Sequence, residues 1–128
     1  MKEPKVAIII SSYNQEKLVQ ENIRNLEKTN YKNYKIYFVD DSGNGKIAVK
    51  IAKNFPKVKI IVNAKNSGFS KSYNLGIKLV KKEYAPEWFL ILNDDCELRD
   101  RNWLKNLLNF SQNKTSGGIF GCKITYPG

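Results

Sequence analysis

The sequence has 128 residues, enough for one domain with a buried core, and carries a formal net charge of +10 without any histidine. The lack of histidine excludes Ser-His-Asp catalysis and most zinc sites, so acid–base chemistry would need carboxylates, tyrosine or lysine. Because the sequence shows neither a signal-peptide pattern nor an apolar run of about 20 residues, it predicts a soluble, cytoplasmic chain with Cys96 and Cys122 reduced.

Short apolar runs recur along the chain and predict strands. The runs contain few polar residues, which is typical of strands that are covered on both faces. The predicted strands are Val6–Ile10, Tyr34–Val39, Lys57–Val62 and Trp88–Leu92, with a candidate fifth strand at Gly118–Cys122.

The segments between these strands carry apolar residues at steps of three or four, which predicts helices with one buried face. The expected buried sets are Val19, Ile23 and Leu26; Ile47, Ile51 and Phe55; Tyr73, Ile77, Val80 and Tyr84; and Trp103, Leu107 and Phe110. Alternating strands and helices predict right-handed crossovers. We therefore expect an α/β fold, with a Rossmann-like, mostly parallel sheet and helices on both faces, in one domain spanning residues 1–128.

Polar residues follow each of the first four predicted strands. They form the segments Ser11–Asn14, Asp40–Gly43, Asn63–Gly68 and Asn93–Asp95. In a parallel sheet the carboxyl ends of the strands lie at one edge, where open α/β folds bind ligands. Four polar segments at one edge, two of them with paired acids, favour a binding site over unrelated polar loops.

The run Trp88–Leu92 continues through Asn93 into Asp94 and Asp95, with no Gly or Pro between them. Adjacent carboxylates repel each other unless water or a cation screens them. Oxygen ligands without histidine favour Mg²⁺ or Mn²⁺ over zinc. The simpler alternative is a solvated acidic turn.

The other strand ends suggest a nucleoside diphosphate ligand. Tyr13 offers a ring on which a base could stack, and Asp40 or Asp41 could accept a hydrogen bond from the base. Gly68 permits close backbone approach, and Ser70 is a candidate N-cap for a helix whose amino end would attract phosphate. Simpler roles stay open: packing for Tyr13, a turn for Gly68 and capping of the first helix for Asn14.

These motifs together resemble the amino-terminal half of the inverting glycosyltransferases of family 2, which have the GT-A fold. The resemblance runs from about Val6 to the end of the chain, with the motifs in the order of the family. The matching segments are Val6–Asn14, Val39–Ser42, Asn66–Ser70, Asn74–Ile77 and Leu92–Asp95.

The resemblance implies a role for each matched position. Near the nucleobase it places Ser11, Tyr13 and Asn14, together with Asp40 and Asp41, of which Asp41 is the more direct contact. Along the donor it places Asn66, Gly68 and Asn74. Asp94 would lie near the ribose and Asp95 would bind Mg²⁺ or Mn²⁺. Asn93 stands where the stricter Asp-x-Asp motif has its first acid, so this chain has one carboxylate fewer.

The implied function is transfer of a sugar from a nucleoside-diphosphate donor to an acceptor hydroxyl, with this chain as the donor- and metal-binding part. In this family the general base usually lies in the carboxyl-terminal half. The resemblance therefore implies a base beyond residue 128 and an isolated chain without activity. The sugar, the nucleobase and the saccharide, lipid-linked or protein acceptor stay open.

Three alternatives remain from the sequence. Asn93 and the missing half also fit a non-catalytic nucleotide-sugar-binding or interaction module. The scattered lysines would permit weak, salt-sensitive contact with nucleic acid, or association with an anionic inner membrane face, but no motif for specific nucleic-acid recognition is present. A phosphoacceptor receiver domain is disfavoured, because its acidic pair should follow the first strand, where Ser11 and Ser12 stand.

Overall fold

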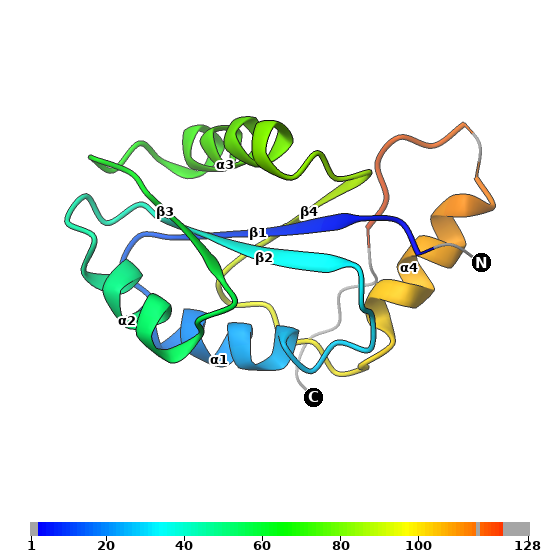
Figure 1. Cartoon of the computed structure of the whole chain (residues 1–128), viewed down its shortest axis with the longest axis horizontal. Helices are drawn as coiled ribbons and strands as arrows, with labels where there is room; N and C mark the ends of the chain where they lie inside the picture. Colours follow the sequence, from blue (N-terminus) through cyan, green and yellow to red (C-terminus); the bar gives the residue numbers. More distant parts are fainter. Residues whose placement is uncertain (1–2, 115, 122–128) are drawn as a thin grey trace.

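The computed structural model describes residues 3–114 and 116–121, and within them a parallel sheet is flanked by helices (Figure 1). The strands are β1 (Val6–Ser12), β2 (Tyr34–Asp40), β3 (Lys59–Val62) and β4 (Trp88–Leu92). The helices are α1 (Glu16–Leu26), α2 (Lys46–Asn54), α3 (Phe69–Glu83) and α4 (Trp103–Gln112). None of these described helices is long and apolar enough to cross a membrane.

Alternate residues of β1 and β2 are buried against opposite layers, whereas the outer strands β3 and β4 are only partly covered. Ile8 and Ile10 of β1 pack with residues of α1, α2 and α4, whereas Ala7 and Ile9 pack with residues of α3. In Figure 1, α3 lies alone on one side of the sheet and α1 and α2 lie on the other. The predicted α/β fold with a parallel sheet and helices on both faces is confirmed.

The strand order β3-β2-β1-β4 places β1 at the centre of the sheet. The chain adds β2 and β3 on one side of β1 and then crosses to add β4 on the other side, and all three pairings are parallel. The direction of growth therefore reverses between β1 and β4. Such a reversal leaves a crevice at the carboxyl ends of the two strands, which is the usual ligand-binding position in open α/β sheets.

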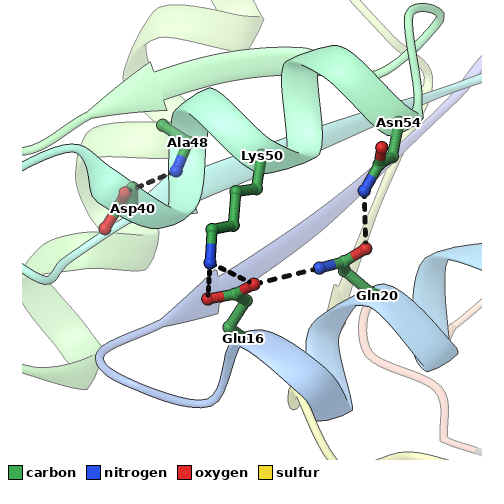
Figure 2. Close-up of polar contacts among 6 residues, drawn as sticks. All are labelled: Glu16, Gln20, Asp40, Ala48, Lys50 and Asn54. Carbon is green, nitrogen blue, oxygen red and sulfur yellow. Dashed lines mark hydrogen bonds and ion pairs between the residues drawn. The ribbon is translucent and has the colours of Figure 1, made fainter.

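Helices α1 and α2 are joined on their solvent side by a chain of polar contacts (Figure 2). Lys50 Nζ lies 2.9 Å from Glu16 Oε1, and Asn54 Nδ2 donates to Gln20 Oε1 at 2.8 Å. The exposed ion pair is worth roughly 0.2–1 kcal/mol. The buried apolar faces of the two helices therefore supply most of the stabilisation, and the polar contacts align one helix against the other.

Four predicted elements differ in extent or orientation. Strands β1 and β2 continue past their predicted ends at Ile10 and Val39, to Ser12 and Asp40. Strand β3 begins at Lys59 rather than Lys57, because the preceding residues form a turn in which Val58 N donates to Phe55 O. Helix α4 buries Trp103, Leu104 and Leu108, whereas Phe110 is 55% exposed. The indole N–H of Trp103 donates to Thr29 Oγ1 at 3.0 Å, which fixes the rotation of α4 away from the predicted face.

The predicted fifth strand is not found over residues 118–121, and Cys122 lies outside the described residues. The Phe120 ring instead packs against Trp88 and Phe110, with ring centroids 5.8 and 6.0 Å apart. The contacts that hold Phe120 are therefore between aromatic rings, rather than backbone hydrogen bonds to a neighbouring strand.

Close packing of α3 on the sheet depends on Gly76. A Cβ atom at this position would lie 3.1 Å from Ile9 Cγ2 and 3.2 Å from Val39 Cγ2. We expect Gly76→Val to lower the free energy of unfolding by about 1–3 kcal/mol, because a branched side chain overpacks a filled interface. Urea unfolding measures this, with Lys78→Val on the exposed side of α3 as the control. An equal loss in both variants would mean that helix propensity, not packing, sets the cost.

Candidate functional site

The carboxyl edge of the sheet brings together the four polar segments that the sequence predicts to meet. Asp41 N donates to Ser12 O, and Asn63 N donates to Asp40 O, both at 2.9 Å. Ser12 Oγ donates to Asp94 Oδ2 at 3.0 Å across the crevice between β1 and β4. The ends of β1, β2, β3 and β4 are therefore joined by direct hydrogen bonds.

Asp40 is fully buried and stabilises the amino end of α2. Its two carboxylate oxygens accept hydrogen bonds from Ser42 N at 2.9 Å and from Ala48 N at 2.7 Å, the second of which Figure 2 shows. Helix α2 has no side-chain cap at Gly45, its N-cap residue. The Asp40 carboxylate therefore replaces the missing cap and complements the positive end of the helix dipole.

Asp41 fixes the loop between β3 and α3. Its carboxylate accepts hydrogen bonds from Asn63 Nδ2, Ser67 N and Gly68 N at 2.9, 3.1 and 3.2 Å. The side chain is only 4% exposed. Asp41 thus orders the backbone of the loop. A nucleobase contact to Asp40 or Asp41 stays a prediction. Asp41 is the favoured contact, because a small part of its side chain is exposed whereas Asp40 is fully buried.

The segment after β4 is held from two sides. Ser12 Oγ, which also accepts from Gln15 N at 3.2 Å, binds Asp94, and Asn22 Nδ2 of α1 donates to Asn93 O at 2.9 Å. Between α1 and this segment lies a hollow of about 430 Å³, whose lining includes Asn22, Asp94 and Asp95. The two acidic side chains therefore border open space beside α1.

Asp95 is exposed, and within the described ranges no hydrogen bond or ion pair engages its carboxylate. In the same part of the chain no group of three His, Cys, Asp or Glu side chains is positioned to hold a metal ion. One or two carboxylates still suit Mg²⁺ or Mn²⁺ when phosphate and water complete the coordination. Asp94 and Asp95 fit that type of donor set.

The Tyr73 hydroxyl bridges β1 and β4 at the crevice. It accepts a hydrogen bond from Ser11 N at 3.2 Å and donates to Leu92 O. Burial raises the pKa of Tyr73 to about 12, and the carboxylates of Asp94 and Asp95 add to the increase although the Ser11 hydrogen bond opposes it. The phenol therefore stays protonated, and able to donate, throughout the neutral range.

The remaining predicted residues lie at the rim. Tyr13 is 52% exposed, so packing does not account for its whole side chain, and the side chains of Asn14, Asn66 and Asn74 are exposed as well. Asn14 does not cap α1, because Gln15 is its N-cap residue and no side chain caps it. These four side chains are open to a ligand, and within the part of the chain that the structure describes no hydrogen bond joins them to the carboxylates of the site.

The structure tests the predicted helix cap at Ser70 and the predicted turn at Gly68. The N-cap residue of α3 is Gly68, so the predicted cap at Ser70 is wrong. Gly68 has φ +85°, a conformation that favours glycine, and its N–H is shared between Asp41 and Asn66 Oδ1. The amino end of α3 is therefore held by the Asp41 carboxylate rather than by a local hydroxyl.

Sequence reasoning assigned no individual role to several residues that support the site, although three of them lie in the predicted polar segments. Ser12, Asn22, Asn63 and Ser67 all act through contacts to residues distant in the sequence, and the helical period assigned Tyr73 to the core without revealing its hydroxyl contacts. The position of Ser12 after an apolar strand was a usable signal. The others carry no local pattern that separates them from ordinary polar or core residues.

Two curated relatives match most of this chain. An uncharacterized glycosyltransferase of Haemophilus influenzae is 26% identical over 111 residues, which cover 84% of this chain and 32% of that protein. Glycosyltransferase GlyG of Streptococcus pneumoniae is 23% identical over 124 residues, which cover 94% of this chain and 40% of that protein. The chain therefore spans about a third of the length of one of these relatives and two fifths of the other.

Solved structures show the same fold. The mannosyltransferase PcManGT of Pyrobaculum calidifontis, in complex with GDP-Man and Mn²⁺, has a TM-score of 0.77 at 19% identity and covers 91% of this chain and 35% of its own. S. aureus TarS has a TM-score of 0.68 at 23% identity and covers 95% of this chain and 38% of its own. The fold is therefore of the GT-A type. The model of glycosyl transferase family 2 matches residues 7–128, and the chain belongs to this family.

Proposed function

We propose that this chain is the donor-binding part of a glycosyltransferase and that it binds a nucleoside-diphosphate sugar, with Mg²⁺ or Mn²⁺, at the carboxyl edge of its sheet. The observation that carries the proposal is the direct linkage of four polar strand ends at the reversal point between β1 and β4. The Mn²⁺ and GDP-Man of the mannosyltransferase neighbour support the same ligand class.

The exposed and the buried residues would have separate roles. Tyr13 offers a free ring for base stacking, and the Asn66–Gly68 backbone is held ready for close approach by the donor. Asp95 would hold the divalent ion, which when bound would supply Lewis-acid neutralisation of charge on the departing diphosphate, and Asp94 would lie near the ribose. Ser12 restrains Asp94 and so limits the reorganisation that binding requires.

Acceptor activation is assigned to a group outside this chain. The strand-end acids already have roles in the fold or in cation binding: Asp40 and Asp41 are buried against backbone N–H groups, and Asp94 and Asp95 border the cation position. We therefore expect the isolated chain to bind a donor without transferring the sugar to an acceptor.

Calorimetric titration with uridine, guanosine and thymidine diphosphates, each with and without Mn²⁺, tests this function. We expect one of the three to bind, and Mn²⁺ to tighten that binding by roughly tenfold or more, because each 1.4 kcal/mol of cation-mediated attraction is a factor of ten. Failure of all three nucleotides to bind, with and without Mn²⁺, would contradict the proposal.

A further inference from the structure

Asn22 is a polar residue on the buried face of α1. Its side chain is only 2% exposed, and it shares that face with the apolar residues Val19, Ile23 and Leu26. A buried amide costs free energy unless its nitrogen and its oxygen both have hydrogen-bond partners. The position of Asn22 therefore calls for a polar partner at each end of the amide.

Among the residues that the structure describes, only one end of this amide has a partner. Asn22 Nδ2 donates to the Asn93 carbonyl at 2.9 Å, whereas Asn22 Oδ1 is buried without a hydrogen bond. Exchanging the two atoms would place the amide oxygen against the Asn93 carbonyl oxygen, and neither of these atoms can donate. The contact with Asn93 therefore fixes the orientation of the amide, and the atom left without a partner is an acceptor.

Asn22 also lies beside the acids of the candidate cation site. It lines the hollow of about 430 Å³ next to α1, together with Asp94 and Asp95. Arg24 and Lys28 line the same hollow, but in the described part of the chain neither donates a hydrogen bond to Asn22 Oδ1. Mg²⁺ and Mn²⁺ keep several waters when one or two carboxylates bind them, and hydrogen bonds that involve a charged group are the stronger ones. A cation at Asp95 would therefore bring suitable donors to this hollow.

We propose that Asn22 is a positioning residue for the divalent cation: Nδ2 holds the Asn93 carbonyl, and Oδ1 accepts a hydrogen bond from a water bound to the cation. This inference rests on the proposed function and adds a residue of α1 to the site at the strand ends. Ser12 holds the Asp94 carboxylate from β1, so the acidic segment is restrained from two elements. The buried oxygen gains its partner when the cation binds, which offsets the cost of leaving it unpaired before.

The test compares Asn22→Ala with Asn25→Ala by calorimetry. Asn25 lies on the same helix and lines the same hollow, but its side chain makes no hydrogen bond in the part of the chain that is described. In Asn22→Ala, we expect the Mn²⁺ concentration for half-maximal binding, with the preferred nucleoside diphosphate present, to rise roughly tenfold, the lower end of the range for lost supporting contacts at metal sites. Asn25→Ala should change this concentration less than about twofold, and nucleotide affinity without metal should change equally little in both variants.

The side-chain amide signals of Asn22 provide a second readout, which uses the unaltered chain and so does not depend on the folding of a variant. When Mg²⁺ is added with the nucleotide present, we expect the Asn22 signals to shift and the Asn25 side-chain signals to stay in place. The inference is overturned if the Asn22 signals do not move, as they would not if a solvent water unrelated to the cation were bound to Oδ1. It is also overturned if the two variants weaken Mn²⁺ binding equally, or if Asn22→Ala weakens nucleotide binding equally with and without Mn²⁺. If the unaltered chain binds no nucleotide in either condition, the proposed function fails and this inference fails with it.

Discussion

Asp40→Ala is expected to lower the free energy of unfolding by about 2–4 kcal/mol, because it leaves a buried backbone donor in the first turn of α2 and another in the preceding loop without acceptors. Both oxygens of this fully buried carboxylate are used, one by Ser42 N and one by Ala48 N. Asp40→Asn should lose most of the same stability, since one oxygen becomes an N–H₂ group that faces another donor. Urea unfolding followed by circular dichroism measures both variants.

Asp100→Ala is the matched control for this prediction. Asp100 is exposed and accepts a single backbone hydrogen bond, from Asn102 N at 2.9 Å near the start of α4. Its removal should cost about 1 kcal/mol or less, because water can replace the lost acceptor. If Asp40→Ala were no more costly than Asp100→Ala, the carboxylate would not be the cap of α2.

Asp95→Asn is expected to remove most of the Mn²⁺-dependent gain in nucleotide affinity, an effect on the order of tenfold, because the variant loses the carboxylate proposed to bind the cation. The free energy of unfolding should change by less than about 0.5 kcal/mol, since the side chain is exposed and has no partner in the described part of the chain. Calorimetry with Mn²⁺ and urea unfolding measure the two quantities separately.

Glu97→Gln separates direct coordination from the general field of the acidic residues. Glu97 lines the same hollow and is exposed, with Arg99 Nε 3.9 Å from its carboxylate. Its neutralisation should weaken Mn²⁺ binding less than about threefold, because exposed charges are screened by salt over roughly 10 Å. Equal losses in Asp95→Asn and Glu97→Gln would show that the net negative charge, rather than a ligand, attracts the ion.

Much of the fold follows from local pattern in the sequence. The nearly uninterrupted apolar runs of β1 and β2 predict strands covered on both faces, and the helical period of Val19, Ile23 and Leu26 predicts the buried face of α1. The rotation of α4 could not be predicted in this way. It depends on the Trp103–Thr29 hydrogen bond, which joins residues 74 positions apart.

The candidate site is predictable in outline but not in its internal roles. Parallel strands bring their polar ends to one edge, so the proximity of Ser12, Asp41 and Asp94 follows from topology. Whether an acid faces a ligand or a backbone N–H depends on distant partners. The Asp40 carboxylate accepts a hydrogen bond from Ala48 N, eight residues away, and the Asp41 carboxylate accepts one from Gly68 N, 27 residues away.

Paramagnetic broadening of backbone amide signals by Mn²⁺, in the presence of the preferred nucleoside diphosphate and with Mg²⁺ as the diamagnetic control, locates the bound cation directly. We expect the strongest broadening in residues 11–14 and 93–96, which flank the separation of β1 and β4, and little in α4. Broadening that centred on the exposed acids of α1, or that was spread evenly over the surface, would contradict a nucleotide–metal site at the carboxyl edge of the sheet.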